Sequence, residues 1–193
     1  DEGPGLVMFN AFYGPGATID SPGDTNQDLA VPKAEIPALD QVIDDLHLKG
    51  QNRKETLRAL SSFFQEKFTY STWQAEQPPM RTNETAISRF LLRAHTGHCE
   101  YFASTTVLLL RRLGIPARYA VGFSVHEGSG HNYVVRQRDA HAWCLVWDEK
   151  AGYWQDFDTT PPSWVEAEAE RASPLQWLSD AWSRLGFEFA KFR

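Results

Sequence analysis

The spacing of apolar residues changes along this 193-residue chain, from a helical period before Gly114 to a strand period after it. In the first part, apolar residues recur every three or four positions, which places them on one face of a helix. In the second part, apolar and polar residues alternate over short runs, as they do in half-buried strands. Helices followed by hairpin-linked strands are typical of an α+β fold, and we predict that class.

Three helices are expected before residue 95. The first covers residues 39–46 and the third covers residues 85–94, each with one apolar face. The second begins at Asn52, which has the spacing of a capping box with Glu55. Its apolar stripe consists of Leu57, Leu60, Phe64 and Phe68. Residues 68–80 end in two prolines, so we expect a loop between the second helix and the third.

A fourth helix is expected at the centre of the fold. Residues 99–113 are apolar almost all round, which is typical of a helix that is buried on every side. Gly114 is suited to the position after the helix end, and Pro116 prevents the helix from continuing.

The strands follow this helix. Alternating runs predict strands at residues 119–125, 132–136, 140–148 and 153–158. Residues 149–152 are expected to form the hairpin loop between the last two strands. Residues 127–130 read Glu-Gly-Ser-Gly and are expected to form a loop of their own.

The chain divides into three parts. Residues 1–37 are rich in Gly and Pro and are expected to form an extended arm with a strand or two. Residues 38–165 hold the periodic elements and are expected to form the core domain. Residues 166–193 contain one more amphipathic helix, with an unusual number of aromatic residues. Aromatic residues favour a membrane interface, whereas the same helix can also pack on the domain; we favour packing.

Composition and charge exclude several classes of protein. The length suits one domain, and no stretch reaches the ~20 apolar residues of a membrane-spanning helix. The net charge of −6 argues against a nucleic-acid partner, because phosphate binding requires a basic face. Two cysteines cannot form a disulfide framework or a zinc site. The chain starts at Asp1 without a signal peptide, so we expect an excised fragment or a processed protein.

Cys99 is the first candidate for chemistry. It lies in the first turn of the expected buried helix, where the helix dipole favours a thiolate over a thiol. The free backbone N–H groups at the same helix end are also suited to hold an oxyanion. The alternative is a buried structural cysteine, because cysteine is among the most frequently buried residue types.

His141 and Asp158 are candidate partners of that thiol. His141 lies near the start of one expected strand, where its side chain is suited to act as a general base. Asp158 ends the next strand, so hairpin pairing is expected to bring its carboxylate beside His141 and orient the ring. Taken singly, a strand histidine and an aspartate before two prolines are both common structural features. Together with Cys99 they form a Cys-His-Asp set in chain order.

Several motifs resemble the core of the transglutaminase-like superfamily. The motifs are residues 68–71 (FTYS), 97–104 (GHCEYFAS), 113–119 (LGIPARY), 139–143 (DAHAW) and 158–160 (DTT). The resemblance extends over residues 50–165 and is strongest to bacterial, membrane-anchored members. It implies a papain-like fold with Cys99 as nucleophile, His141 as base and Asp158 as the residue that orients it.

The resemblance also implies the reaction class. Members of this superfamily transfer an acyl group from an amide, typically a glutamine carboxamide, through a thioester to an amine or to water. We therefore expect a protein or peptide substrate, no cofactor, and a location at the periplasmic or extracellular side of a bacterial membrane. No calcium-loop motif is visible, so we expect no metal.

The chain departs from the family pattern at a few positions. Thr159 replaces a proline that is common after the aspartate, and Asp156 is the fallback for orienting His141, because it lies on the same strand face as Asp158. Cys144 and Leu145 stand where many relatives have a small apolar residue and a glutamate. Because Cys144 alternates with Trp143, we expect it to face away from His141 and into the core.

Three further residues have open interpretations. The resemblance implies that Tyr70 or Trp73 completes an oxyanion hole, whereas loop packing is the simpler role for both. His98 is adjacent to Cys99 and is either a substrate contact or a solvated residue at the helix start.

Two rival functions remain open. A papain-like peptidase or amidase would use the same fold and the same three residues. A non-catalytic binding module of a membrane-anchored protein is the second rival, although a pure binder has no need for all three residue types. The sequence does not indicate an oligomeric state.

Overall fold

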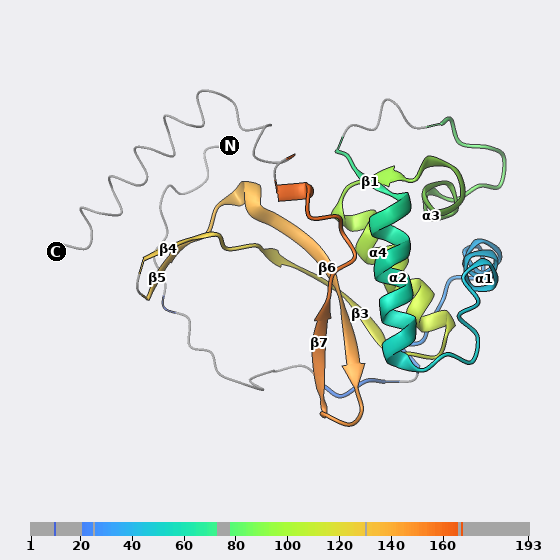
Figure 1. Cartoon of the computed structure of the whole chain (residues 1–193), viewed down its shortest axis with the longest axis horizontal. Helices are drawn as coiled ribbons and strands as arrows, with labels where there is room; N and C mark the ends of the chain where they lie inside the picture. The colour runs from blue at the N-terminus through green and yellow to red at the C-terminus, as the bar shows by residue number, and fades with distance from the viewer. Residues whose placement is uncertain are drawn as a thin grey trace.

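The computed structural model of the chain describes Asn10 and residues 21–24, 26–72, 78–129, 131–165 and 167. In this part of the chain, helices lie on one side of an antiparallel sheet, which confirms the α+β class (Figure 1). The predicted helix over residues 166–193, and Trp73, lie outside the described residues. No helix among the described residues combines the length and the hydropathy needed to cross a membrane.

The expected helices are present. They are α1 (Ile36–Asp45), α2 (Arg53–Lys67), α3 (Ala86–Arg89) and α4 (Cys99–Arg112). A short π-helix, η1 (Phe90–Ala94), continues α3 and completes the helix expected over residues 85–94. The capping box at the start of α2 is formed, because the Asn52 side chain accepts from the Glu55 backbone N–H at 3.0 Å.

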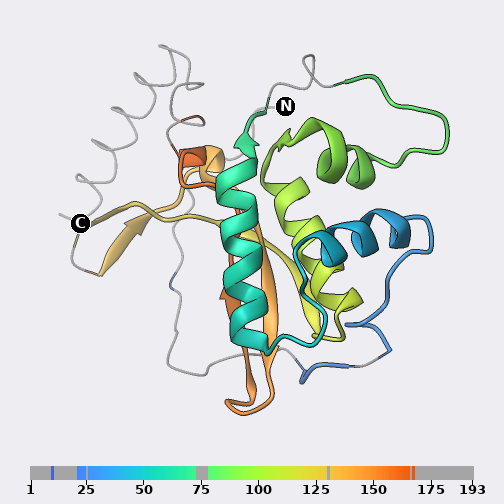
Figure 2. The same ribbon diagram turned by 45° about the vertical axis from the view of Figure 1, so that its right-hand side comes forward.

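Helix α4 is the central helix, as its composition predicts. It packs on β3 and β6 of the sheet, with α2 running alongside it (Figure 2). Its buried residues are Phe102, Ala103, Thr105, Thr106, Val107, Leu109 and Leu110. Gly114 follows its end with φ +77°, a left-handed conformation that favours glycine.

A cluster of phenylalanines joins α4 to α2 and η1. Phe64 of α2 and Phe102 of α4 are both fully buried, and their ring centroids lie 5.7 Å apart. Phe90 contacts both rings, and Phe68 contacts all three. Each such side chain contributes about 1.5–3 kcal/mol to folding by its burial. This cluster fixes the helix that begins at Cys99 relative to its neighbours.

The main sheet has three antiparallel strands in the order β3-β6-β7: β3 (Ala117–Phe123), β6 (Ala140–Asp148) and β7 (Tyr153–Phe157). A separate hairpin pairs β4 (Glu127–Ser129) with β5 (Asn132–Val134). The prediction of a loop at residues 127–130 was therefore wrong, because β4 forms through pairing with β5. Strand β3 also begins two residues before the expected position, and a 3-10 turn, η2 (Gln137–Asp139), precedes β6.

Two short strands also correct the loop predicted over residues 68–80. Strand β1 (Thr69–Tyr70) pairs in parallel with β2 (Thr96–Gly97), and Tyr70 lies opposite Gly97. Two-residue strands leave no periodic signal in a sequence, because their pairing is set by the tertiary contacts around them. The pair fixes the chain immediately before Cys99.

The two faces of the main sheet have different surroundings. Ala142, Cys144 and Val146 are buried on the face that α4 covers. On the other face, Trp154 Nε1 donates to the backbone oxygen of Ser21 at 2.9 Å. The arm is attached to the domain at this point.

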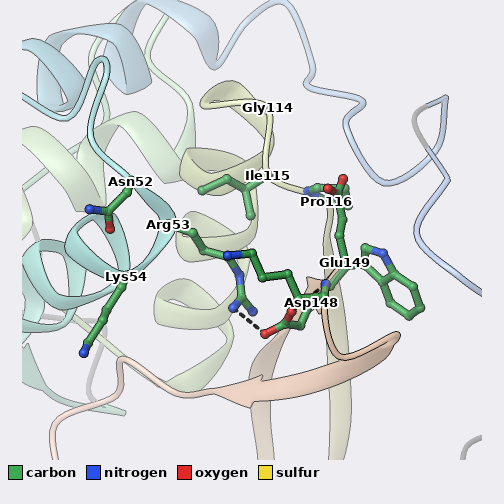
Figure 3. A pocket seen from close by; sticks show the side chains of 10 residues that line it. Asn52, Arg53, Lys54, Gly114, Ile115, Pro116, Asp148 and Glu149 are labelled. Atoms are coloured by element: carbon green, nitrogen blue, oxygen red, sulfur yellow. Dashed lines mark hydrogen bonds and ion pairs between the residues drawn. The ribbon is translucent and has the colours of Figure 1, made fainter.

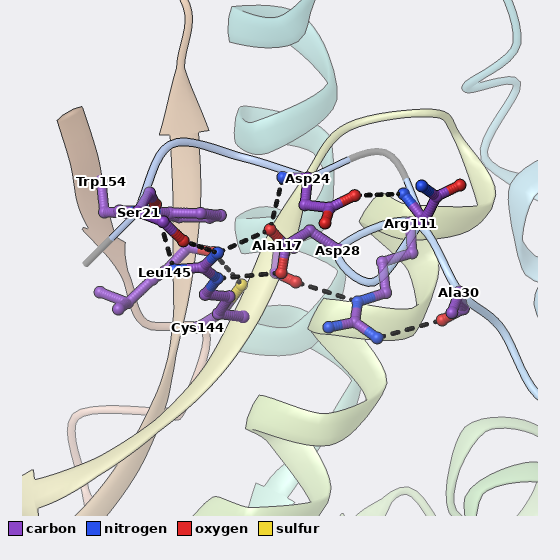
Figure 4. A network of polar contacts seen from close by, with 11 residues as sticks. Ser21, Asp24, Asp28, Ala30, Arg111, Ala117, Cys144, Leu145 and Trp154 are labelled. Atoms are coloured by element: carbon purple, nitrogen blue, oxygen red, sulfur yellow. Dashed lines mark hydrogen bonds and ion pairs between the residues drawn. The ribbon is translucent and has the colours of Figure 1, made fainter. Parts of the chain in front are cut away.

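An ion pair reinforces the attachment of the arm. The Arg118 guanidinium donates to both carboxylate oxygens of Asp28 at 2.9 Å, and Asp28 is almost fully buried. Arg111 of α4 donates to the backbone oxygens of Ala117 and Ala30, so the same network reaches the central helix (Figure 4). No strand occurs among the described residues of the arm, 21–24 and 26–35.

Candidate active site

Cys99 is the first residue of α4 and is half-buried. Its approach is fixed by the β1-β2 pair, because the Ser71 N–H donates to the Gly97 oxygen at 2.8 Å. At Gly97, an added Cβ would lie 3.0 Å from the Tyr101 ring and 3.2 Å from the Phe90 ring. A glycine therefore allows the chain to pass these rings and enter the helix at Cys99.

His141 and Asp158 form the contact expected from hairpin pairing. His141 is the second residue of β6, and Asp158 follows directly after β7, which pairs with β6. The distance from His141 Nε2 to Asp158 Oδ2 is 2.7 Å, so the ring donates to the carboxylate. The other carboxylate oxygen, Oδ1, accepts from the Thr160 backbone N–H at 2.9 Å. Both oxygens of Asp158 are thereby held in place.

Thr159 ties this carboxylate to α4. Its hydroxyl lies 2.7 Å from the hydroxyl of Thr106, and both side chains are buried. The residue that departs from the family pattern therefore joins the segment that follows β7 to the helix that begins at Cys99.

The thiol of Cys99 contacts His141. Burial alone would raise the pKa of Cys99, but hydrogen bonds from the side chains of His141 and His98 and from the Ala142 backbone lower it to about 6. His141 Nε2 donates to Asp158, and Nδ1 is buried with no hydrogen-bond partner of its own, so Nδ1 is the nitrogen left to face Cys99. The ring thus lies between the thiol and the carboxylate.

The charge state of His141 follows from the same contacts. Burial opposes the imidazolium, but the hydrogen bonds to Asp158 and Cys99 and their negative charges outweigh it and raise the pKa of His141 to about 9. A thiolate and an imidazolium therefore coexist between these two values. At neutral pH the site holds a Cys99–His141 ion pair.

Trp164 is a member of the site that the sequence pattern does not reveal. It lies in a helical turn after two prolines and is buried. Its ring stacks on the His141 ring with the centroids 4.1 Å apart and the planes at 10°. Trp143 is nearly parallel to the ring of His141 as well, but its centroid is 6.3 Å away. No local periodicity marks Trp164, because its contact depends on where the segment after β7 folds back.

The other candidates lie as follows. Asp156, the fallback residue for orienting His141, instead accepts from Trp143 Nε1 at 2.7 Å. The structure therefore brings Asp158 to His141 and leaves Asp156 on the neighbouring indole. Tyr70 is buried in β1 opposite Gly97, and Gly97 is two residues before Cys99. Its role at an oxyanion hole stays a prediction.

His98 and Cys144 complete the account of predicted residues. His98 is the N-cap residue of α4, where it is half-buried and hydrogen bonds to Cys99, and a contact with substrate stays a prediction. Cys144 is 1% exposed on the face covered by α4, which confirms its place in the core. Burial raises the pKa of Cys144 far above that of an ordinary thiol.

One cavity lies away from these residues, with a volume of about 540 Å³ (Figure 3). It is bounded by the start of α2, the loop after α4 and the end of β6, where Arg53 bonds to Asp148 at 3.0 Å. Asp148 is seven residues along β6 from His141, or about 23 Å at 3.3 Å per strand residue. The cavity is thus separate from Cys99. Among the described residues, no three His, Cys, Asp or Glu side chains form a cluster suited to a metal ion.

Comparisons with known proteins identify the family of the chain. Residues 40–159 match the model of the transglutaminase-like superfamily. A protein-glutamine gamma-glutamyltransferase of Pseudomonas aeruginosa is 28% identical over 161 residues, which are 70% of this chain and 24% of that protein. The uncharacterized protein YebA of Bacillus subtilis is 34% identical over 99 residues, which are 48% of this chain and 13% of YebA. This chain thus spans about a quarter or less of these curated relatives.

Solved structures show the same fold. The periplasmic domain of TgpA from Pseudomonas aeruginosa, bound to ethylmercury, matches with a TM-score of 0.57 and 27% identity over 70% of this chain and 48% of that one. A second structure of that domain matches with a TM-score of 0.61 and 24% identity over 76% of this chain and 51% of that one. Because the family model matches more than half of the residues, the chain belongs to the transglutaminase-like superfamily.

Proposed function

We propose that this chain is the catalytic part of a cysteine-dependent acyltransferase that acts on the carboxamide of a glutamine in a protein or peptide. The observation that carries the proposal is the pair of contacts from His141, to Cys99 on one side and to Asp158 on the other. Acyl transfer through a thioester requires a nucleophile, a proton carrier and a group that orients the carrier. The Pseudomonas aeruginosa relative is named a protein-glutamine gamma-glutamyltransferase, which supports the same substrate class.

Acylation begins from the ion pair. The Cys99 thiolate attacks the carboxamide carbon and forms the carbon–sulfur bond, while the carbonyl oxygen becomes an oxyanion. The His141 imidazolium then gives its proton to the departing nitrogen, which leaves as ammonia when the carbon–nitrogen bond breaks. The products of this half-reaction are a thioester on Cys99 and a neutral His141.

Deacylation reverses the proton movement. Neutral His141 takes a proton from an amine or from water, whose nitrogen or oxygen attacks the thioester carbon. The carbon–sulfur bond breaks, the Cys99 thiolate is regenerated, and His141 is left as the imidazolium. Asp158 holds the ring and stabilises its positive charge in both half-reactions.

We propose that the oxyanion forms at the start of α4. The first N–H groups of a helix have no intrahelical acceptors, and the helix dipole favours negative charge there. Cys99 begins α4, so an oxyanion formed at its thiol lies close to those groups. Tyr70 of β1 is proposed to contribute a side chain to the oxyanion hole. Trp73, which lies outside the described residues, is the other candidate.

An apolar strip on β3 is proposed to receive the acyl donor. Its members are Tyr119, Val121 and Phe123, which are 42%, 70% and 51% exposed. They lie opposite Cys144, Ala142 and Ala140 of β6, on the same face of the sheet as these residues, but α4 leaves them exposed. Burial and the negative charges of Glu100 and Cys99 raise the pKa of Tyr119. Apolar residues beside the reactive glutamine would fit this strip.

The location of the parent protein is also a proposal. The solved relatives are periplasmic domains, which supports a site of action outside the cytoplasm of a bacterium. The resemblance to bacterial, membrane-anchored members of the superfamily implies a membrane anchor in the parent protein. Contact of residues 166–193 with the membrane surface is a separate proposal.

The test is an assay that separates acyl transfer from its rivals. Purified chain is incubated with a glutamine-containing peptide and a primary amine, and the products are read by mass. Amine incorporation that disappears in Cys99→Ala is expected. Release of ammonia with conversion of glutamine to glutamate identifies water as the acceptor. Cleavage of the peptide bond alone points to a peptidase, and peptide binding without any product points to a binding module.

A further inference from the structure

The Trp164 ring stacks on the His141 ring, and no step of the proposed acyl transfer uses this contact. The two rings are almost parallel, at 10°, and their centroids are 4.1 Å apart, which is the geometry of a cation held over the face of an indole. Trp164 is 7% exposed and the side chain of His141 is also 7% exposed, so the contact is shielded from water. Cation–π attraction is strongest under such desolvated conditions.

The position of Trp164 is set by the rest of the fold. The Trp164 N–H donates to the Pro161 oxygen at 3.1 Å, which closes the turn that brings the indole back over β6. Two residues before that turn, Thr159 is bonded to Thr106 of α4. The same short segment therefore carries the carboxylate at the edge of the His141 ring and the indole on its face.

We propose that Trp164 is a positioning residue for acyl transfer, whose indole holds the His141 ring between Cys99 and Asp158 and stabilises the imidazolium that protonates the leaving ammonia. The reason is that the hydrogen bond from Nε2 to Asp158, with Cys99 on the other side of the ring, holds the ring only along its edge. A face contact removes the remaining rotation out of that line. The role rests on the proposed function only where activity is the readout.

The pH dependence of kcat/KM distinguishes this positioning role from a purely structural one. The charged and titratable groups that act on the ring are Cys99 and Asp158. His98 hydrogen bonds to Cys99, and the ring centroid of His126 lies 6.3 Å from that of Trp164. His141 is an imidazolium both before and after Cys99 ionises. Removing the indole therefore destabilises both states equally and leaves the acid limb of kcat/KM, which reports ionisation of Cys99, unchanged. The alkaline limb, where the imidazolium loses its proton, moves instead.

The experiment compares Trp164→Leu with Trp164→Phe, because both replacements are apolar and only phenylalanine retains an aromatic face. In Trp164→Leu, the apparent pKa of the alkaline limb of kcat/KM is expected to decrease by about one pH unit. In Trp164→Phe, the same apparent pKa is expected to decrease by no more than about half as much. Trp147→Leu is the matched control, since this tryptophan of β6 contacts Trp154 rather than His141. Equal loss of activity at every pH in both Trp164 variants would overturn the proposal.

Fluorescence gives a readout that needs no catalysis and no leucine variant. A protonated imidazole stacked on an indole quenches its emission, so emission of the unmodified chain is expected to rise as His141 loses its proton near pH 9. The rise should disappear in Trp164→Phe and persist in His126→Asn. A rise that is unchanged in Trp164→Phe would contradict the proposed contact, whether or not the chain proves to be an acyltransferase.

Discussion

The hydroxyls of Thr106 and Thr159 lie 2.7 Å apart in the interior, and this bond joins the central helix to the segment that carries Asp158. Cys99 begins that helix, and Asp158 precedes Thr159 directly. The distance between nucleophile and carboxylate is therefore fixed through the core as well as through His141.

Thr159→Val should weaken both stability and activity. Valine has nearly the same shape, so the change removes one buried hydrogen bond and leaves the Thr106 hydroxyl without its partner, at a cost of about 1–3 kcal/mol in the free energy of unfolding. We expect kcat to fall about tenfold through displacement of Asp158, which is the loss that about 1.4 kcal/mol of the barrier produces. Denaturant unfolding and steady-state kinetics measure the two effects.

Thr105→Val is the matched control for this prediction. Thr105 is equally buried on α4, but its hydroxyl has no hydrogen-bond partner among the described residues. Its replacement is therefore expected to leave stability unchanged or to raise it. If both valine variants behave alike, the Thr106–Thr159 bond does not support the site.

Asp158→Asn and Asp156→Asn should have very different effects. Asp158 holds His141 Nε2 at 2.7 Å, whereas Asp156 accepts from the Trp143 indole. An amide at position 158 favours the wrong tautomer of the ring, and we expect kcat to fall by about 10²–10⁴. The Asp156 variant should stay within about threefold, since it changes one partly exposed hydrogen bond. The opposite order in kcat would move the orienting role to Asp156.

The rate should have a bell-shaped dependence on pH. Hydrogen bonds lower the pKa of Cys99 to about 6 against the effect of burial, so kcat/KM rises as pH increases through that value and the thiolate forms. The pKa of His141 is raised to about 9, so kcat/KM falls as pH increases through that value and the proton donor is lost. The two limbs belong to the coupled pair. Activity that continues to climb through pH 10 would exclude an imidazolium in the rate-limiting step.

Val121→Asp should weaken the binding of apolar acyl donors. A carboxylate in the middle of the strip formed by Tyr119, Val121 and Phe123 is costly to desolvate beneath an apolar side chain. We expect KM to rise about tenfold for a peptide with leucine beside glutamine and about twofold or less for one with serine, at an unchanged rate of Cys99 alkylation. Tyr153→Asp is the control, because Tyr153 is similarly exposed at the other end of the sheet, opposite Asp148. A uniform change in KM for both peptides would remove the strip from substrate recognition.

Much of this site is predictable from the sequence because its signals are local. A cysteine at the start of an apolar helix, a histidine near the start of a strand and an aspartate at the end of the next can each be placed by periodicity alone. Pairing of β6 with β7 then brings His141 and Asp158 together. The choice between Asp156 and Asp158 is not local, because the two positions have the same parity in the sequence and only the folded site decides which carboxylate reaches the ring.

The remaining features depend on contacts between distant segments. Strands β1 and β2 are two residues long and exist only because α2 and η1 bring them together. His98 precedes α4, as the sequence indicates, but its contacts with the Tyr101 ring and with Cys99 are set by the folded site. Trp164 reaches His141 through a turn after two prolines, and no periodicity foretells that return.

The most direct test of the account is the mass of the enzyme itself during turnover. The chain is mixed with a glutamine peptide in the absence of amine, quenched in acid within the first turnover and analysed intact and after digestion. We predict an adduct equal to the peptide minus ammonia, located on Cys99 and absent from Cys99→Ala. Product formation without any adduct on Cys99, or an adduct located on Cys144, would contradict the proposed thioester mechanism.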